Sequence, residues 1–597
     1  MKKTICLLLA LCLLAAALAG CGDEPQAGPL YAERGRVSRE PLGALAPAAD
    51  SAAILENLSQ AAGDRGGAYE EADPQAEDGA GAALARSLKT DAAGSLAQSD
   101  GSFLYLLDSY GLIVLSAAGA DSELLSYTRI RREGESWDER LFLGPDRVAV
   151  LYSSAGAESE EEAPRQDASA VRVTVLDTSD KRAPRELSSL SLEGSLAEAC
   201  LLDGTLCLVT RRSFWELPPA EQAESLLPRL TENGETLTLA PGDVYLSQAP
   251  ARTALTTVTA LRLSDGRVAD ALAFTDGVES VRQAGNTLLL SRTFWAETRS
   301  EPYEEAPYTV VERSFSARTE LRRLRLDGTL RPEGGCVLEG ALPDADSLEL
   351  LEGGLRALTL TDSRSDAAYT DAAHGWTNYE QRGRSRGAQL ALLDADLELS
   401  GALTDLGGEE PVRAARFAGS TALLLTGREE APVYAAGLSD PAAPVLGGSL
   451  PAGERPAWLL PWEGELVLSI GDPAAEDGWR LAMLDLSDPA APRVIDSLRL
   501  RGAAPASELT DRGILMCDPA AGLIGLPVRT DGKTEYLLVR WTGQELNRKG
   551  AIAEEGLPGD ARGLLVNGLL YLCSPGAVLV ADPGSLELLT TVSNAVG

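Results

Sequence analysis

The stretch Leu484–Leu498 (LDLSDPAAPRVIDSL) has two near-copies elsewhere in this chain, Leu176–Leu190 (LDTSDKRAPRELSSL) and Gly437–Leu450 (GLSDPAAPVLGGSL). In each copy an apolar segment ends at a Ser-Asp turn. A proline then directs the chain into the next segment, because proline cannot donate to a strand ladder. A unit that recurs early and late in one chain indicates a repeat architecture.

Short apolar strands preceded by tight-turn residues recur from about residue 99 onward. Examples are Asp203-Gly204 before TLCLVT, Gly285-Asn286 before TLLLS and Asn567-Gly568 before LLYLC. Together they make about nine four-stranded units, a number and spacing typical of a β-propeller. We predict an all-β fold, with one propeller over residues 99–597. We expect about eight blades and accept seven to nine, because partial first and last units can share a sheet.

Two stacked β-sandwich domains are the main alternative to this fold. A four-stranded sheet cannot bury both of its faces alone, and either architecture solves this by packing sheet on sheet. The near-copies at early and late positions disfavour two separate sandwiches.

The N-terminus determines the expected compartment. Met1-Lys2-Lys3 is basic, and the apolar run from Ile5 to Ala17 is shorter than the about 20 residues of a membrane span, which is typical of a signal peptide. Leu18-Ala19-Gly20-Cys21 resembles the bacterial lipobox, and this resemblance implies cleavage before Cys21 and a diacylglyceryl group on its thiol. We therefore predict a signal peptide over residues 1–20 and an extracytoplasmic lipoprotein anchored to the cell membrane through Cys21. An ordinary secretory signal with a chance cysteine is the alternative.

Residues 21–98 are expected to form a tether between this anchor and the propeller. The segment is rich in Ala, Gly, Asp, Glu and Pro. Ser51–Gln60 can form one short helix. Gly63–Ala83 has few large apolar residues and many charges, which predicts disorder.

The formal net charge of -36 excludes several partners. Nucleic-acid binding proteins carry basic patches, so we expect no nucleic-acid partner. Adsorption to anionic lipids is equally disfavoured, so the lipid on Cys21 must provide membrane residence. Cys200 and Cys207 flank the Asp203-Gly204 turn symmetrically. They can form a strained cross-strand disulfide or stay as two buried free thiols, and the sequence leaves both alternatives open.

The stretch Gly407–Gly471 resembles a family of secreted bacterial and archaeal proteins with a C-terminal β-propeller, distantly WD40-like. A glycine-acidic loop, an Arg-Phe strand, a Leu-Ser-Asp-Pro turn and a proline-bracketed aromatic follow one another there, and the likeness extends from about Ser87 to about Pro527. This chain departs from the pattern at Leu460, where relatives tend to have histidine, and at Glu349-Leu350, where an Asp-Glu pair is reduced. The resemblance implies a fold and a location, and it implies no reaction.

The residues that catalysis most often needs are scarce. His374 is the single histidine, which excludes zinc sites built on two histidines, and there is no Gly-x-Ser-x-Gly elbow for a serine nucleophile. We therefore expect no catalytic residues, no metal and no cofactor, and we expect that the protein is not an enzyme. An extracytoplasmic hydrolase with acidic residues at the propeller channel is the alternative, since 89 acidic residues make chance pairs abundant.

Long insertions fall between the second and third strand of several units, and in a propeller these connections emerge on one face. These insertions carry a cluster of large aromatic residues, in a chain that is only 5% aromatic. Exposed aromatics on loops suit recognition of a protein, peptide or glycan, whereas aromatics that fold back would only cap the ring. The candidate binding face consists of Trp215, Trp295, Tyr303, Tyr308, Trp376, Tyr379 and Trp479.

We therefore predict a cell-envelope lipoprotein that acts as a binding scaffold. Its expected partners are the membrane, through the lipid, and an envelope protein or glycan. A structural or regulatory partner of another envelope protein, without a ligand of its own, is a further alternative.

Overall fold

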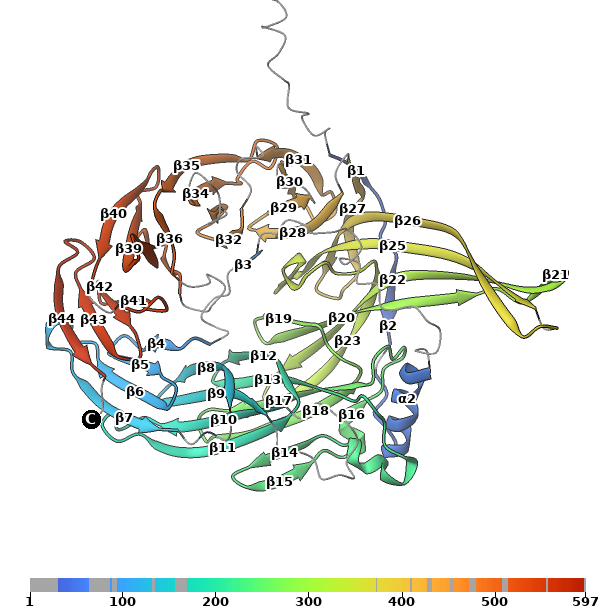
Figure 1. Cartoon of the computed structure of the whole chain (residues 1–597), viewed down its shortest axis with the longest axis horizontal. Coiled ribbons are helices and arrows are strands. Elements are labelled where there is room, and N and C mark those ends of the chain that lie inside the picture. Colours follow the sequence, from blue (N-terminus) through green and yellow to red (C-terminus); the bar gives the residue numbers. More distant parts are fainter. Residues whose placement is uncertain are drawn as a thin grey trace, which may run out of the picture.

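The chain folds into a closed ring of antiparallel β-sheets with one arm projecting from it, as seen in a computed structural model (Figure 1). The structure describes residues 30–43, 45–63, 86–87, 94–130, 132, 135–155, 169–371, 373–408, 411–426, 432–450, 456–471, 479–506, 514–554 and 557–594.

The first five blades occupy the chain from Ala97 to Gly407. Their strands are β4 (Ala97–Ser99), β5 (Phe103–Leu107), β6 (Gly111–Ser116) and β7 (Leu124–Arg129) in blade 1; β8 (Ser136–Gly144), β9 (Arg147–Ala155), β10 (Ser169–Asp177) and β11 (Arg185–Glu193) in blade 2; β12 (Ser195–Leu202), β13 (Thr205–Ser213), β17 (Ala254–Arg262) and β18 (Arg267–Thr275) in blade 3; β19 (Ser280–Ala284), β20 (Thr287–Arg299), β22 (Tyr308–Leu326) and β23 (Leu330–Glu339) in blade 4; β24 (Leu348–Leu351), β25 (Gly354–Asp371), β26 (Trp376–Asp394) and β27 (Leu399–Gly407) in blade 5.

Four further blades complete the ring. Their strands are β28 (Val412–Ala418), β29 (Thr421–Thr426), β30 (Val433–Gly437) and β31 (Val445–Leu450) in blade 6; β32 (Trp458–Pro461), β33 (Leu466–Ile470), β34 (Trp479–Asp485) and β35 (Arg493–Leu500) in blade 7; β37 (Met516–Asp518), β38 (Leu523–Thr530), β39 (Lys533–Trp541) and β40 (Leu546–Ile552) in blade 8; β41 (Arg562–Val566), β42 (Leu569–Cys573), β43 (Ala577–Ala581) and β44 (Leu588–Ser593) in blade 9.

Smaller elements decorate the blades. They are β14 (Arg229–Glu232) and β15 (Glu235–Thr238) on blade 2, β16 (Val244–Tyr245) on blade 3, β21 (Tyr303–Glu305) on blade 4, β36 (Ala503–Pro505) on blade 8, and the 3-10 turns η3 (Gly119–Asp121), η4 (Ala220–Leu226), η5 (Pro241–Asp243) and η6 (Ala345–Ser347).

The predicted all-β propeller is confirmed, with nine four-stranded blades in the described part of the chain. This is at the upper end of the expected range. The central expectation of eight assumed that the first and last units share a sheet. Instead each of them is complete, and they meet through side chains: Ile113 of blade 1 and Tyr571 of blade 9 lie in one buried cluster, and Tyr571 Oη accepts a hydrogen bond from the Gly119 N–H (2.9 Å).

The hydrophobic core is divided into clusters between neighbouring blades. For example, Leu289 of blade 4 packs with Leu355 and Ala391 of blade 5. Since each sheet is covered on both faces, whole strands are apolar and buried, as in TALLLT of β29. Nine such clusters link the blades in sequence around the ring. They explain why many strands have continuous apolar sequences and do not alternate apolar with polar residues.

The three near-copies form the same type of turn, and in blades 2, 6 and 7 it joins the third strand to the fourth. The carboxylates of Asp180, Asp440 and Asp488 each accept a backbone hydrogen bond of 3.0 Å from the residue two positions later. Each turn also packs on the fourth strand of the preceding blade. The Gly448 N–H donates to Pro489 O (2.8 Å), and Ser126 Oγ donates to Lys181 O (2.7 Å). The repeated turn therefore holds neighbouring blades together through hydrogen bonds.

The predicted hairpin turns adopt the backbone angles that their residues favour. Asp203 and Gly204 have positive φ values of 43° and 76°, as a two-residue hairpin requires. This turn places Cys200 directly opposite Cys207, and both are buried free thiols.

The N-terminal segment differs from the predicted tether. β1 (Tyr31–Arg34) pairs with β27, and β2 (Arg39–Leu42) pairs with β23, so this segment adds an outer strand to blades 5 and 4. The expected helix is present as α2 (Ser51–Gly63) and packs on blade 3 through Ile54 and Leu58. β3 (Arg86–Ser87) pairs with β32 of blade 7. The composition concealed these contacts because the outer strands bury few side chains. Residues 1–29 and 64–85, including the predicted signal peptide, Cys21 and most of the expected disordered stretch, lie outside the described residues.

Candidate functional site

The long insertions lie between the second and third strands of their blades, as the sequence predicted. Two of them are strands rather than loops. β20 and β22 of blade 4 extend far beyond the ring, as do β25 and β26 of blade 5 (Figure 1). The two extended hairpins pair with each other, since residues Thr309–Ser316 of β22 lie opposite Ser363–Thr370 of β25. They form one four-stranded sheet, here called the arm, which comprises residues 293–318 and 361–387.

One face of the arm carries alternating arginine and aromatic side chains, here called the ladder face. The Arg364 guanidinium lies 4.9 Å from the ring centre of Trp295 and 5.1 Å from that of Phe315. The Arg313 guanidinium lies 5.2 Å from Phe315 and 4.4 Å from Tyr379. Each such contact contributes about 0.5–1 kcal/mol at an exposed site. A single-layered sheet has no second layer to bury against, so this ladder stabilises the arm.

Ion pairs fix the arginines of the arm. Arg313 makes a bidentate pair with Asp366 (2.7 and 2.9 Å). Asp362 pairs with Arg384 (2.6 Å) and Arg386 (3.3 Å). Burial acts to raise the pKa of Asp362, but the two arginines outweigh it and hold that pKa below its ordinary value. The ladder face is therefore preorganised rather than freely flexible.

The opposite face of the arm carries a cluster of tyrosines, here called the tyrosine face. Tyr308 lies edge-on to Tyr369, with ring centres 5.8 Å apart, and tilted against Trp376 at 5.5 Å. Tyr303 donates a hydrogen bond to Glu312 (3.0 Å). The Tyr303 and Trp376 side chains remain 42% and 43% exposed, so the cluster presents apolar area to solvent.

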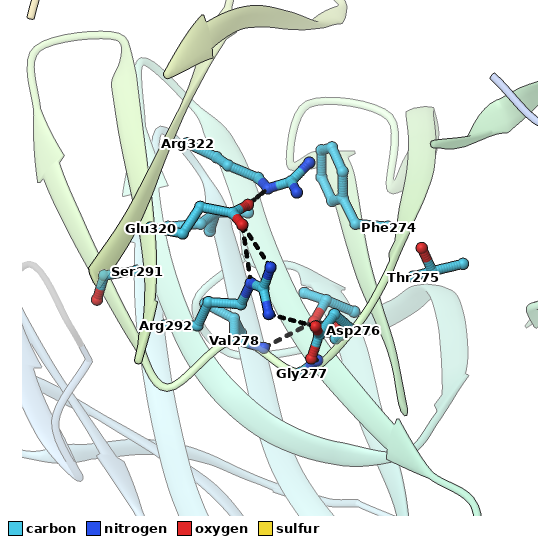
Figure 2. Close-up of a pocket in the computed structure, with 11 residues that line it drawn as sticks. Phe274, Thr275, Asp276, Gly277, Val278, Ser291, Arg292, Glu320 and Arg322 are labelled. Atoms are coloured by element: carbon cyan, nitrogen blue, oxygen red, sulfur yellow. Dashed lines mark hydrogen bonds and ion pairs between the residues drawn. The ribbon is translucent and has the colours of Figure 1, made fainter. Parts of the chain in front are cut away.

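A buried network of charges holds the base of the arm (Figure 2). Arg292 Nε donates to Glu320 (3.1 Å), its Nη2 donates to Ala249 O (2.8 Å), and its Nη1 pairs with Asp276. Glu320 pairs in turn with Arg322. Because Arg292 directly precedes the arm on β20 and Glu320 closely follows it on β22, the network fixes where both strands leave the ring.

The carboxylates of this network depend on the arginines beside them. Burial raises the pKa of Asp276, although the Arg292 charge acts in the opposite direction. Burial also acts to raise the pKa of Glu320, but Arg322 and Arg292 outweigh it, and the pKa of Glu320 lies below its ordinary value. Removing Arg292 would therefore leave Asp276 buried without its counter-charge, and Glu320 with Arg322 alone.

The same network reaches the N-terminal helix. Asn57 of α2 donates to Ser247 O (2.9 Å) and accepts from Thr275 Oγ1 (2.6 Å). Ser247 Oγ accepts a hydrogen bond from Arg292 Nη2 (3.1 Å). A chain of buried polar contacts thus connects α2, the insertion of blade 3 and the base of the arm.

A small cavity adjoins the network between blades 3 and 4. Its volume is about 20 Å³, which admits a water molecule and excludes an organic substrate. Arg322 Nη1 is buried beside it and has no hydrogen-bond partner among the described residues. We therefore regard this region as the structural base of the arm and not as a substrate pocket.

Comparison with known proteins places the chain in a family. A family model described as a beta propeller domain matches residues 94–583. The chain belongs to this beta propeller family. The resemblance to a propeller family is thereby confirmed. The propeller is 22% identical over 467 residues to an uncharacterized protein of Archaeoglobus fulgidus, covering 68% of this chain and 69% of that protein. It is 31% identical over 112 residues to an uncharacterized protein of Methanocaldococcus jannaschii, covering 19% of this chain and 18% of that protein.

Two solved structures show weaker similarity. One is a crystal structure of a eukaryotic initiation factor, with a TM-score of 0.34 and 10% identity, covering 76% of this chain and 87% of that one. The other comes from a study of two prolyl endopeptidases, with a TM-score of 0.31 and 11% identity, covering 74% and 52%. At these TM-scores neither structure carries an argument about the function of the propeller. Among the described residues, no helix is long and apolar enough to cross a membrane.

Of the seven aromatic residues predicted to form one binding face, six lie in three different places on the surface insertions. Trp295 and Tyr379 are on the ladder face of the arm. Trp215 is 72% exposed but belongs to the insertion of blade 3, beside α2. Tyr303, Tyr308 and Trp376 are on the tyrosine face.

The prediction for Trp479 is wrong. Its side chain is fully buried, and it packs with Ile524, Leu526 and Val539 in the core between blades 7 and 8. As the first residue of β34 it faces blade 8, so it is a core residue of the propeller and not part of a binding surface.

Sequence reasoning missed the arginines that organise the arm and its base. The spacing Arg-x-Phe recurs at Arg292–Phe294 and Arg313–Phe315, and the two members of each pair contact each other. Residues two apart on a strand share a face, so this spacing was a readable signal for stacking. No comparable sequence pattern indicated that β22 pairs with β25, because the sequence of each hairpin does not show which strand lies beside it.

Proposed function

We propose that this propeller is a lipid-anchored protein of the bacterial cell envelope that binds a protein partner through its arm. The observation that carries this proposal is the arm itself. It is a preorganised sheet that leaves the ring and exposes Tyr303 and Trp376 on one face and Tyr379 and Arg384 on the other, and tryptophan, tyrosine and arginine dominate the energetics of protein interfaces.

The contacts of the N-terminal segment indicate which part of the ring the proposed lipid would hold near the membrane. Leu30 follows Cys21 by nine positions, and nine residues span at most about 30 Å. Because β1 is paired to the outer strand of blade 5, a lipid on Cys21 would hold that rim close to the membrane surface. The arm, which blades 4 and 5 supply, would then meet its partner close to the membrane.

Acidic residues near the inner strands offer little support for the hydrolase alternative. Glu198 of β12 pairs with Arg140 (2.9 Å), and Asp346 pairs with Arg282 (2.8 Å). Burial raises the pKa of Glu349 on β24, as a general acid would need, but its ion-pair neighbour is Arg356 (3.0 Å) rather than a second carboxylate. These carboxylates tie strands together, so we favour binding over catalysis.

The proposed function is tested by comparing three full-length proteins in membranes of the host. A variant whose arm is shortened by replacing residues 295–317 and 362–386 with Asn-Gly turns, which keep the strand register, is expected to stay in the membrane fraction and to lose the partner that copurifies with the unaltered protein. Cys21→Ser is expected to do the reverse, leaving the membrane fraction while still binding the partner. Unaltered copurification with the shortened arm, in a protein whose melting temperature shows an intact ring, would contradict the proposal.

A further inference from the structure

The arm leaves one long strand edge open. On one side β26 pairs with β25 from Trp376 to Asp394, whereas β27 covers its other side only at Leu390–Leu393. Within the described part of the chain, no strand lies against the outer edge of residues 376–387. All twelve of these residues are exposed, so their outward N–H and C=O groups face solvent.

The other edge of the arm is covered at both ends, whereas residues 294–299 of β20 between them have no further strand beside them among the described residues. The Thr293 N–H of β20 donates to the Glu279 carboxylate (2.8 Å), and β21 with its flanking Pro302 and Pro307 closes the outer part. Natural proteins usually blunt an exposed edge with proline, bulges or charge. β26 has no proline between 376 and 387, and its single bulge lies opposite Ser365–Asp366, so the regular stretch from Trp376 to Gln381 is unprotected.

The open edge differs in charge from the rest of the molecule. Residues 376–387 contain Arg382, Arg384 and Arg386 against the single acid Glu380, in a chain of net charge -36. Asp362 pairs with Arg384 and Arg386, and Glu380 pairs with Arg382 (3.4 Å), so three arginines stand beside two carboxylates along this edge. The edge is therefore a local basic site on an acidic protein, where an acidic segment can dock.

We propose that the open edge of β26 binds an extended acidic segment of the partner protein as an additional strand of the arm. Backbone hydrogen bonds to residues 376–381 supply the register, and acidic side chains of the segment pair with the arginines at the ring end. The apolar side chains of the segment pack on Trp376 (43% exposed) on the tyrosine face, and its acidic side chains lie on the ladder face, where Tyr379, Arg384 and Arg386 are. The inference rests on the proposed function, since it names how the arm recognises its partner.

Synthetic peptides test this mode of binding on the full-length protein. The probe is a decapeptide that alternates glutamate with valine, used at about 1 mM. Hydrogen–deuterium exchange of residues 376–387 is expected to slow when it binds. The same peptide with every backbone nitrogen methylated keeps its charge but cannot donate hydrogen bonds, and it is expected to give no protection. A version with lysine in place of glutamate is expected to bind at least about tenfold more weakly.

A pair of variants provides the matched control on the protein. Arg382→Glu combined with Arg386→Glu is expected to weaken binding of the acidic decapeptide by at least about tenfold. Arg331→Glu reverses an exposed charge on β23, outside the arm, and is expected to leave binding unchanged. Exchange of β25 in the free protein reports whether each variant keeps its arm folded.

Absence of protection by the acidic decapeptide, or equal protection by its methylated form, would overturn the edge inference. That failure is separable from a failure of the proposed function. If shortening the arm removes the partner although the decapeptide protects nothing, the arm binds by another surface. If the partner still copurifies after the arm is shortened, the proposed function itself is wrong.

Discussion

Trp479→Ala is expected to destabilise the ring by about 3–5 kcal/mol, the cost of deleting a large buried side chain and leaving a cavity. The indole lies between blades 7 and 8, where Leu481 and Ile524 are also fully buried, and the close packing of two sheets prevents the site from collapsing. The loss is measured as a lowered midpoint of denaturant unfolding.

Trp215→Ala is the matched control, because it removes the same side chain from a position that is 72% exposed. Its effect on stability is expected to stay within about 0.5 kcal/mol. Equal effects of the two substitutions would contradict the assignment of Trp479 to the core.

Arg292→Ala is expected to have an effect of similar size, about 3–5 kcal/mol, for an electrostatic reason. Without this guanidinium, Asp276 keeps only its backbone donors Ala251 N (2.7 Å) and Gly277 N (2.7 Å), and Glu320 keeps only Arg322. Since the network fixes the base of the arm, limited proteolysis is expected to cut β20 and β22 faster as well.

Arg262→Ala removes an arginine whose pair with Asp265 is largely exposed, with side-chain exposures of 49% and 43%. Such a pair contributes at most about 1 kcal/mol, so the midpoint is expected to move little and the proteolysis pattern to stay unchanged. A comparable loss of stability in both variants would show that the buried network has no special role.

Local patterns predicted the ring well, because a propeller repeats local units. The turns at Asp203-Gly204 and Asn567-Gly568 have the positive φ values that their residues favour, and the Ser-Asp turns recur with the same hydrogen bonds. Strand order and the position of the insertions followed from the same pattern. The observed nine blades lie at the upper end of the expected range, because the first and last blades close the ring through side-chain packing and not through a shared sheet.

Contacts between distant segments could not be predicted. β1 has the sequence YAER, which shows no apolar alternation, since it binds to blade 5 mainly through its backbone. Trp479 and Trp376 are both aromatics at the start of a strand that follows an insertion, yet one is buried and the other exposed. The difference arises because a neighbouring blade packs against Trp479, and the residues next to each tryptophan in the sequence do not indicate this packing. The arm as a binding surface therefore stays a proposal.

Site-specific photo-crosslinking in living cells is the most direct test of the claim that the arm recognises a partner. A benzophenone amino acid would replace Trp376 or Tyr379 on the arm and, as a control, the exposed Leu589 on blade 9. The account predicts one discrete protein adduct from both arm positions and none from Leu589. An adduct from Leu589 with none from either arm position would contradict it.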